Sequence, residues 1–240
     1  MWTSIALASE HRPYSGTVWR LVEAQHRIST NRLSANLAEQ EELELLAEAV
    51  KPDLPDNARH LDYLLASPFR YGHRQESRFR RANERPGIFY ASETEATAIA
   101  EAAYWRLRFF ARSPGFGAPR TTSEHSSFSV RVASERALDL TRPPFSREAA
   151  AWRDPDEYTA CQDLAVLART VRTQIIRTVS ARDADHRCNI VILDPAAFAR
   201  NAPAPGRTWH LRFEEGRLMA LAAFPSGDRF VFTAEGFGLA

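Results

Sequence analysis

This sequence contains almost no lysine. Lys51 is the only lysine among 240 residues, so nearly all of the positive charge is carried by arginine. Arginine suits the planar, two-pronged hydrogen bonding of carboxylates and phosphates, but a GC-rich genome produces the same bias. The high alanine and proline content favours the genomic explanation, so the arginine excess by itself does not predict an anion site.

Cysteine is also scarce. The two cysteines, Cys161 and Cys188, belong to no Cys-x-x-Cys motif and to no cluster of cysteine and histidine. Secreted disulfide frameworks and structural zinc sites need such groupings. We therefore expect reduced thiols, no disulfide framework and no metal site.

The chain has no long apolar run and no excess of charge. No stretch approaches the ~20 apolar residues of a membrane-spanning helix, and the segment MWTSIALASEHRP lacks the basic and apolar regions of a signal peptide. We therefore expect a cytoplasmic protein without a membrane partner. The net charge of +1 argues against a general nucleic-acid-binding surface.

What is present fits one globular domain, since 44% of the 240 residues are hydrophobic. Strands are predicted from alternation and β-branched content at 16–22, 87–91, 126–133, 137–140, 174–183, 189–195, 208–213, 217–224 and 229–233. Helices are predicted at 33–50, 57–67, 92–110 and 154–172. This mixture, with several strands expected to be antiparallel, predicts an α+β fold.

Two segments extend the predicted domain. One is a helical block around 33–66, in which Leu33, Leu37, Leu43, Leu46 and Val50 recur near helical spacing until Lys51-Pro52, and in which a second helix stops at Pro68. The other is a C-terminal β extension around 201–240. Both are candidates for a partner surface or for self-association into a homo-oligomer, between which the sequence does not choose.

The helix at 92–110 carries the most informative pattern. Ser92 and Glu95 have the spacing of a capping box, so the helix should begin at Ser92 and end near Phe110, before SPGFG at 113–117. Helical periodicity then gives a wide apolar surface formed by Ala98, Ile99, Ala102, Ala103, Trp105, Leu107, Phe109 and Phe110. We expect this helix to be mostly buried, with a narrow polar stripe formed by Thr97, Glu101, Tyr104 and Arg108.

Glu101 within that stripe has two interpretations. The carboxylate could simply face water, which periodicity alone favours. Alternatively, the stripe could line a cleft near Tyr90 and the arginines at 78–81, where an acid would face an anion-binding site. Periodicity does not decide between the two.

The order of several short motifs resembles the RES-domain family, named for arginine, glutamate and serine. The matching features, over residues from about 16 to 200, are Arg20, Arg78-Phe79, Gly87 with the strand to Tyr90, Glu101 eleven residues later, YTACQ at 158–162, Ser180-x-Arg182 and Asn189. Each motif is weak alone, and the shared order makes the resemblance specific. Thr178-Val179 departs from the family pattern, and the two extensions place the chain in a longer subgroup.

The resemblance implies a fold similar to the ADP-ribosyltransferases and NAD as substrate. It implies cleavage of the nicotinamide–ribose bond with inorganic phosphate as acceptor, which is NAD phosphorylase activity. The alternatives are ADP-ribosyl transfer to a protein, or a relative that binds a nucleotide or partner without turnover. Family members include toxins that small helix-turn-helix antitoxins of the Xre type inhibit.

The same resemblance assigns candidate site residues. The catalytic candidates are Arg78, Tyr90, Glu101 and Ser180, and the candidates for binding NAD are Arg20, Phe79, Arg80, Thr159, Gln162 and Arg182. Glu101 would grip the ribose and stabilise its positive charge as the base leaves, and Arg20 and Arg78 would bind the diphosphate. Tyr90 would stack on nicotinamide or orient Glu101, and Ser180 would donate a hydrogen bond to phosphate or ribose. Which arginine of 78–81 enters the site stays open.

Overall fold

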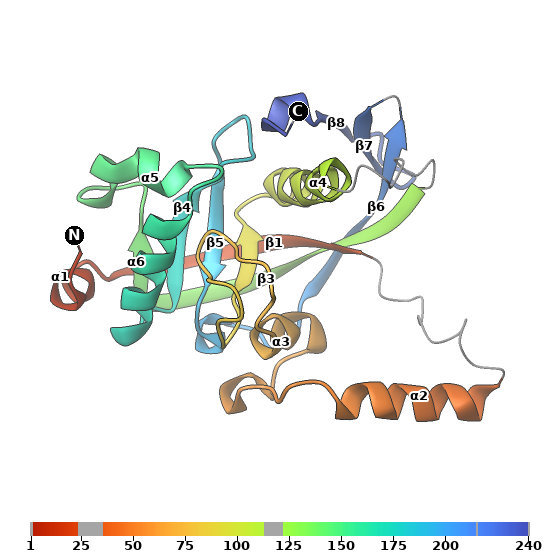
Figure 1. Cartoon of the computed structure of the whole chain (residues 1–240), viewed down its shortest axis with the longest axis horizontal. Coiled ribbons are helices and arrows are strands. Elements are labelled where there is room, and N and C mark those ends of the chain that lie inside the picture. Colours follow the sequence, from red (N-terminus) through yellow and green to blue (C-terminus); the bar gives the residue numbers. More distant parts are fainter. Residues whose placement is uncertain (1, 24–35, 113–121, 215, 240) are drawn as a thin grey trace.

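The computed structural model describes residues 2–23, 36–112, 122–214 and 216–239 (Figure 1). Leu33 and the segment 113–117 lie outside the described residues. The helices are α1 Ser4–Ser9, α2 Leu37–Ala49, α3 Tyr63–Arg70, α4 Glu95–Ala111, α5 Ala149–Arg153 and α6 Thr159–Thr170. The strands are β1 Arg12–Glu23, β2 Phe89–Ser92, β3 Thr122–Asp139, β4 Ile175–Val179, β5 Cys188–Ile192, β6 Ala204–Glu214, β7 Arg217–Ala222 and β8 Arg229–Thr233.

The strands form one mixed sheet in the order β1-β2-β5-β4-β3-β6-β7-β8. The β3–β4 pairing is parallel, whereas the other strand pairings are antiparallel. An additional β1–β3 pairing connects the strands β1, β2, β5, β4 and β3 into a closed circuit. The prediction of an α+β fold with a largely antiparallel sheet and flanking helices is confirmed.

Strand β3 joins the two halves of the sheet. One edge pairs with β1 along most of its length, while the other pairs first with β6 and then, at Ala137–Asp139, with β4. The predicted strands at 126–133 and 137–140 are therefore one strand. Phe128, Val130 and Val132 alternate into the core as predicted, and each is at most 3% exposed.

Three apolar clusters pack around the sheet. In the first, Phe69 and Leu65 of α3 pack with Phe89 and Phe128. The second includes Leu164 of α6. In the third, Ile99, Ala103 and Leu107 of α4 pack with Trp209, Leu211, Leu218 and Ala220 from β6 and β7. The C-terminal meander is therefore part of the core that holds α4 in place (Figure 1).

Helix α4 differs in detail from its prediction. Its N-cap is Thr94, whose Oγ1 accepts from the Thr97 backbone nitrogen at 3.2 Å, so the predicted start at Ser92 is wrong. The face assignment is also partly wrong, because Thr97 and Tyr104 are buried while Trp105 and Phe109 are 40% and 56% exposed. Two of the four residues of the polar stripe are therefore covered by other parts of the chain.

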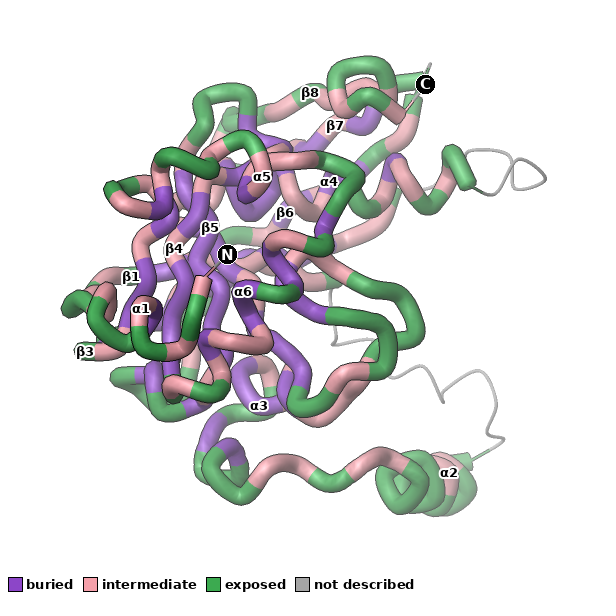
Figure 2. The backbone as a smooth tube through the Cα atoms, turned by 60° about the vertical axis from the view of Figure 1, so that its left-hand side comes forward, coloured by how far each residue is buried: buried purple, intermediate pink, exposed green. Residues whose placement is uncertain are grey.

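The helical block also corrects the sequence-based boundaries. Helix α3 begins at Tyr63 instead of residue 57 and includes Pro68, which was expected to end it. In α2 three of the four leucines are exposed, namely Leu37 at 78%, Leu45 at 71% and Leu46 at 58%, and the helix contributes no buried residue. Figure 2 shows α2 as an exposed segment apart from the buried strands.

Helix α6 is shorter than predicted and begins at Thr159. The Oδ1 atom of Asp154 accepts from the backbone nitrogens of Asp156 and Glu157 at 2.9 and 2.8 Å. This Asx-type turn satisfies backbone donors that a helix start would have left free, so the chain turns before the helix begins. Among the described helices, none is long and apolar enough to cross a membrane.

Candidate active site

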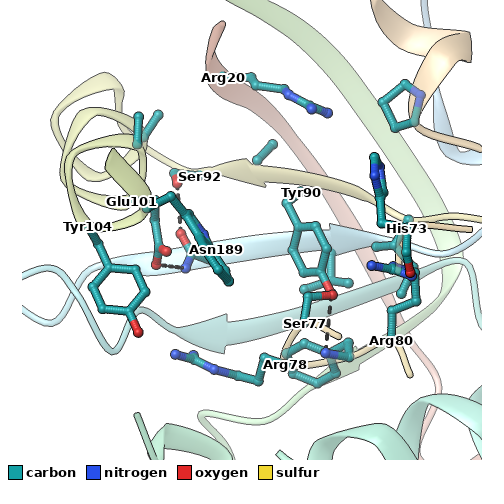
Figure 3. Close-up of a pocket in the computed structure, with 18 of the residues that line it drawn as sticks. Arg20, His73, Ser77, Arg78, Arg80, Tyr90, Ser92, Glu101, Tyr104 and Asn189 are labelled. Atoms are coloured by element: carbon teal, nitrogen blue, oxygen red, sulfur yellow. Dashed lines mark hydrogen bonds between the residues drawn. The ribbon is translucent and has the colours of Figure 1, made fainter. Parts of the chain in front are cut away.

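A cavity of about 710 Å³ opens between α4, α3, the loop at 73–80 and the strands β1, β2 and β5 (Figure 3). Figure 3 shows Glu101, Asn189 and Tyr104 together at one end, His73 at the other end and Tyr90 between them. Seven predicted site residues line the cavity, namely Arg20, Arg78, Phe79, Arg80, Tyr90, Glu101 and Arg182. The interpretation in which Glu101 faces open water is therefore wrong.

The carboxylate of Glu101 is oriented by two neutral donors. Its Oε1 atom accepts from Ser180 Oγ at 2.6 Å and from Asn189 Nδ2 at 2.5 Å. Asn189 is itself fixed by Ser92, whose Oγ donates to Asn189 Oδ1 at 2.7 Å. Within the described residues Oε2 of Glu101 has no such donor, so one carboxylate oxygen is held and the other is available to the cavity.

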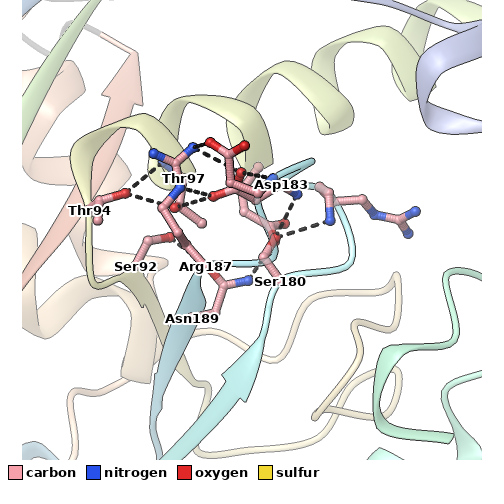
Figure 4. Close-up of polar contacts among 10 residues, drawn as sticks. Ser92, Thr94, Thr97, Ser180, Asp183, Arg187 and Asn189 are labelled. Carbon is pink, nitrogen blue, oxygen red and sulfur yellow. Dashed lines mark hydrogen bonds and ion pairs between the residues drawn. The ribbon is translucent and has the colours of Figure 1, made fainter. Parts of the chain in front are cut away.

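Ser180 belongs to a tight turn between β4 and β5 that is anchored to α4 (Figure 4). Its Oγ accepts from the backbone nitrogens of Arg182 and Asp183 at 3.0 and 3.1 Å. Asp183 in turn accepts from Thr97 Oγ1 of α4 at 2.5 Å and pairs with both Nε and Nη2 of Arg187. These bonds fix the turn, and with it the hydroxyl that meets Glu101.

The ionisation of Asp183 reflects that environment. Burial disfavours its charge, but hydrogen bonds from Arg187 and Thr97 outweigh burial, and the pKa of Asp183 lies below its ordinary value. The turn therefore depends on an ionised aspartate at neutral pH.

Two arginines that line the cavity have unsatisfied buried nitrogens. Arg20 Nη1 and Arg78 Nε are buried without a hydrogen-bond partner, and among the described residues neither side chain forms an ion pair. Burial lowers the pKa of Arg20 to about 10, so it stays charged at neutral pH. The Arg20 guanidinium lies 4.8 Å from the centre of the Phe89 ring, and Arg78 Nη1 donates to the Val179 carbonyl at 3.5 Å. Partly buried guanidinium groups with unsatisfied nitrogens favour an anionic ligand.

Tyr90 lies on the cavity floor with its hydroxyl turned to the loop at 73–80. That oxygen lies 2.8 Å from Ser77 Oγ and accepts from the Phe79 backbone nitrogen at 3.2 Å. Burial raises the pKa of Tyr90 to about 12. The expectation that this hydroxyl orients Glu101 is wrong, because Ser180 and Asn189 do so, whereas the ring face remains free to stack on a ligand.

The arginines at 78–81 separate into distinct roles. The Arg80 guanidinium donates to the carbonyls of His73, Gln75 and Arg81 at 2.5–3.1 Å, so it pins its own loop. Arg81 pairs with Asp163 at the surface, and Phe79 is 1% exposed within the core. Arg78 is therefore the member of the run whose charge is left for the cavity.

Three predicted residues do not line the cavity: Ser180, Thr159 and Gln162. Thr159 is exposed at the start of α6. Gln162 supports two residues that line the cavity, because it donates to Glu76 Oε2 at 2.9 Å and to the Ser77 carbonyl at 3.2 Å. Direct contact of Thr159 or Gln162 with a ligand in this cavity is therefore not supported.

Arg182 builds the wall near Glu101. Its guanidinium carbon lies 3.5 Å from the centre of the Tyr104 ring, and its Nη2 donates to the Pro155 carbonyl at 2.6 Å and to Tyr158 Oη at 3.3 Å. Because this charge is covered by an aromatic ring and bonded to oxygens, Arg182 positions Tyr104 and Tyr158 at the cavity.

Comparison with known proteins identifies the family of this chain. The sequence model of the RES domain matches residues 54–214, well over half of the chain. The chain belongs to the RES family. A solved structure similar to this RES protein is that of the M. tuberculosis MbcT–MbcA toxin–antitoxin complex, with 15% identity, 87% of this chain and 92% of the other covered, and a TM-score of 0.48. The comparison with curated proteins gave no match.

Several cavity residues of this RES protein were not predicted from sequence, including Ser92, Tyr104, Tyr158, Tyr63, Tyr71 and His73. Tyr104 was recognised only as part of the polar stripe that contains Glu101. Its position three residues after Glu101 on one helix face was a usable signal. Tyr63 and Tyr71 had no such signal, because Tyr63 belongs to the helical block and Tyr71 directly follows α3. Among the described residues, no group of three or more histidine, cysteine, aspartate or glutamate side chains is arranged to hold a metal ion.

Proposed function

We propose that this chain consumes NAD by cleaving the bond between nicotinamide and ribose, with inorganic phosphate as acceptor. One observation carries the proposal: one cavity is lined by a positioned carboxylate, Glu101, and by two arginines, Arg20 and Arg78, that form no ion pair with any of the described residues. A dinucleotide has the complementary pair of features, since its ribose becomes cationic as the base leaves and its diphosphate is anionic.

In this mechanism the C1′–N bond of the nicotinamide riboside breaks and its electron pair leaves with nicotinamide, which becomes neutral. The ribose gains oxocarbenium character, which the free oxygen of Glu101 stabilises while Ser180 and Asn189 hold the other oxygen. A phosphate oxygen then bonds to the same ribose carbon, which is numbered C1″ in the product, ADP-ribose 1″-phosphate. Arg20 and Arg78 hold the diphosphate during the reaction, and the Tyr90 ring stacks on nicotinamide.

The acceptor distinguishes this proposal from its alternatives. Incubation of the purified chain with NAD labelled in its adenylate part, with and without phosphate, separates the outcomes. Label in a phosphate-dependent small product supports phosphorolysis, and label on a polypeptide shows protein ADP-ribosyl transfer. Binding of NAD without nicotinamide release shows a non-catalytic relative.

Glu101→Gln is the decisive variant, because it keeps the size of the side chain and removes its charge. Loss of one such electrostatic contact typically costs about 3–4 kcal/mol in barrier, or a several-hundredfold fall in turnover. Nicotinamide release is measured for both proteins, and thermal unfolding confirms that the variant is folded. Unchanged turnover in a folded variant would remove Glu101 from the mechanism.

We further propose that this RES protein acts as the toxin of a toxin–antitoxin pair, with a helix-turn-helix antitoxin as partner. The support is family membership together with a cavity that is open to a blocking segment. The test is co-expression with a helix-turn-helix protein encoded beside the gene. The proposal predicts rescue of growth, a co-purifying complex and loss of NAD consumption.

A further inference from the structure

The cavity extends beyond the groups that the proposed reaction uses. Glu101, Asn189 and Tyr104 lie at one end, while the other end is bordered by α3 and the residues that follow it. The lining residues from this second part are Tyr63, Ser67, Pro68, Tyr71 and His73. Cleavage at the nicotinamide ribose leaves these residues without a role.

Helix α3 has one face for the core and one for the cavity. Leu65, Ala66 and Phe69 are at most 2% exposed and belong to the core cluster beneath the sheet. Tyr63 and Ser67, one helical turn apart, border the cavity instead, and the Tyr63 side chain is 53% exposed. Packing of the apolar face thus holds an aromatic ring at the cavity edge that the core does not cover.

Tyr71 and His73 add two more rings to this region. Tyr71 directly follows α3, and its ring centre lies 6.1 Å from that of His73 at an interplanar angle of 41°. Burial and the charges of Arg80 and Arg20 lower the pKa of His73, so the imidazole is neutral at neutral pH. A neutral imidazole can both donate and accept a hydrogen bond, as recognition of the edge of a base requires.

Arg20, the candidate for binding phosphate, lines the same cavity as Tyr63, Tyr71 and His73. Along the cavity, the Glu101 carboxylate lies at one end, the Arg20 guanidinium extends toward the middle, and the ring of His73 lies at the other end (Figure 3). This order matches the second half of a dinucleotide, in which a planar base follows the diphosphate.

We propose that Tyr63, Tyr71 and His73 form the subsite for the adenine base of the dinucleotide, so that α3 and the residues after it select dinucleotides over mononucleotides. The proposal rests on the proposed function for its choice of substrate. A base stacked on aromatic side chains typically gains roughly five- to a hundredfold in affinity relative to alanine variants.

Binding measurements test the subsite without depending on turnover. AMP and ribose 5-phosphate share a phosphate and a ribose but differ in the adenine base, and each is titrated calorimetrically into the full chain. The expected result is a preference for AMP that falls roughly five- to a hundredfold in Tyr71→Ala and Tyr63→Ala. Tyr71→Phe keeps the ring and should retain the preference.

Phe109→Ala serves as the control for truncating an exposed aromatic residue, because Phe109 lies on α4 and does not line the cavity. It should leave the preference for AMP unchanged, and thermal unfolding checks that every variant is folded. Equal affinity of the wild-type chain for the two ligands would overturn the subsite. An AMP preference that survives in both tyrosine-to-alanine variants would do the same.

A kinetic measurement separates failure of the subsite from failure of the proposed function. The ratio of kcat/KM for NAD to that for nicotinamide mononucleotide should fall in Tyr71→Ala relative to the wild type, since only NAD carries adenine. An unchanged ratio overturns the subsite while leaving NAD cleavage intact. If the chain releases no nicotinamide but prefers AMP through these tyrosines, the subsite stands and the proposed reaction fails.

Discussion

Ser180 and Glu101 are 79 residues apart in sequence, yet Ser180 Oγ lies 2.6 Å from Glu101 Oε1. The serine is fully buried and its hydroxyl oxygen also accepts two backbone N–H groups of its own turn. A hydroxyl with its proton directed to a carboxylate, and with no surface in the cavity, is poorly placed to attack a substrate. Ser180 is therefore a positioning residue that connects the β4–β5 turn to the acid of α4.

Removal of that hydroxyl should weaken turnover without abolishing it. Ser180→Ala leaves Glu101 with one donor, Asn189, and leaves two backbone N–H groups of the turn without an acceptor. The unsatisfied N–H groups should cost about 1–3 kcal/mol of folding stability. Because Glu101 keeps its charge and one donor, we expect kcat to fall less than in Glu101→Gln, roughly five- to a hundredfold, with little change in KM. Steady-state kinetics with NAD measures both parameters.

A nucleophilic serine would behave differently in the same experiment. Turnover would then be lost completely, and mass spectrometry of the wild-type chain quenched during reaction would show an ADP-ribosyl adduct at Ser180. Detection of that adduct would contradict the positioning role.

The Ser92–Asn189–Glu101 chain predicts a graded series of effects. Asn189 touches Glu101 directly, whereas Ser92 reaches it only through Asn189. Asn189→Ala should therefore reduce kcat more than Ser92→Ala, and the double variant should resemble Asn189→Ala alone. Such non-additivity is expected when one residue acts through another. Additive losses of activation free energy in the cycle would show that the two residues act independently.

Ser92 also shows why the local sequence misplaced the start of α4. The segment offers two hydroxyl residues as N-caps, Ser92 and Thr94, and only Ser92 has the glutamate of a capping box three positions later. Local spacing therefore favours Ser92. Long-range bonds decide, because Asn189 takes the Ser92 hydroxyl and Glu95 instead accepts from Trp209 Nε1 at 2.9 Å. A rule confined to four residues does not contain that information.

The candidate site, like the start of α4, could be predicted from the sequence only in part. The order of motifs gave Glu101, Arg20 and Arg78 at one cavity, and it was informative because it combined segments distant in the chain. The order of motifs did not show that the Arg80 guanidinium donates to backbone carbonyls of its own loop or that the Tyr104 ring covers Arg182. Neighbouring arginines look alike in sequence, and their roles depend on which acceptors the folded loop presents to each.

Asp183, which anchors the β4–β5 turn, should make the free energy of unfolding depend on pH in the acidic range. Because the pKa of Asp183 is lowered in the folded state, its charge stabilises the fold above about pH 4, the ordinary value for the unfolded chain. That contribution is lost as the pH falls through the lowered folded-state pKa. Asp183→Asn should cost about 1–3 kcal/mol at pH 7 and progressively less below pH 4. Urea unfolding of both proteins from pH 7 to pH 3 measures this difference.

An outcome with the opposite sign would be informative. If the stability difference between wild type and Asp183→Asn grew toward pH 3, the carboxyl would be stabilising in its protonated form. The pairing with Arg187 would then not be the interaction that holds the turn.

Arg20 should show a trade between stability and ligand binding. Its side chain is partly buried and its Nη1 atom has no hydrogen-bond partner among the described residues, so burial lowers its pKa and costs folding free energy at neutral pH. Arg20→Met keeps much of the length of the side chain and its contact with the Phe89 ring while removing the charge. We expect the variant to be more stable by about 1–3 kcal/mol in urea unfolding at low phosphate, and to bind NAD at least tenfold more weakly.

Added anions separate the two effects of Arg20, because a ligand that binds only the folded state raises its stability by mass action. Pyrophosphate, which mimics the diphosphate of NAD, should raise the unfolding temperature of the wild-type chain more than that of Arg20→Met. The stability advantage of the variant should therefore shrink as pyrophosphate is added. If pyrophosphate stabilised both proteins equally, the unpaired guanidinium of Arg20 would not be an anion site, and its exposure to the cavity would need another explanation.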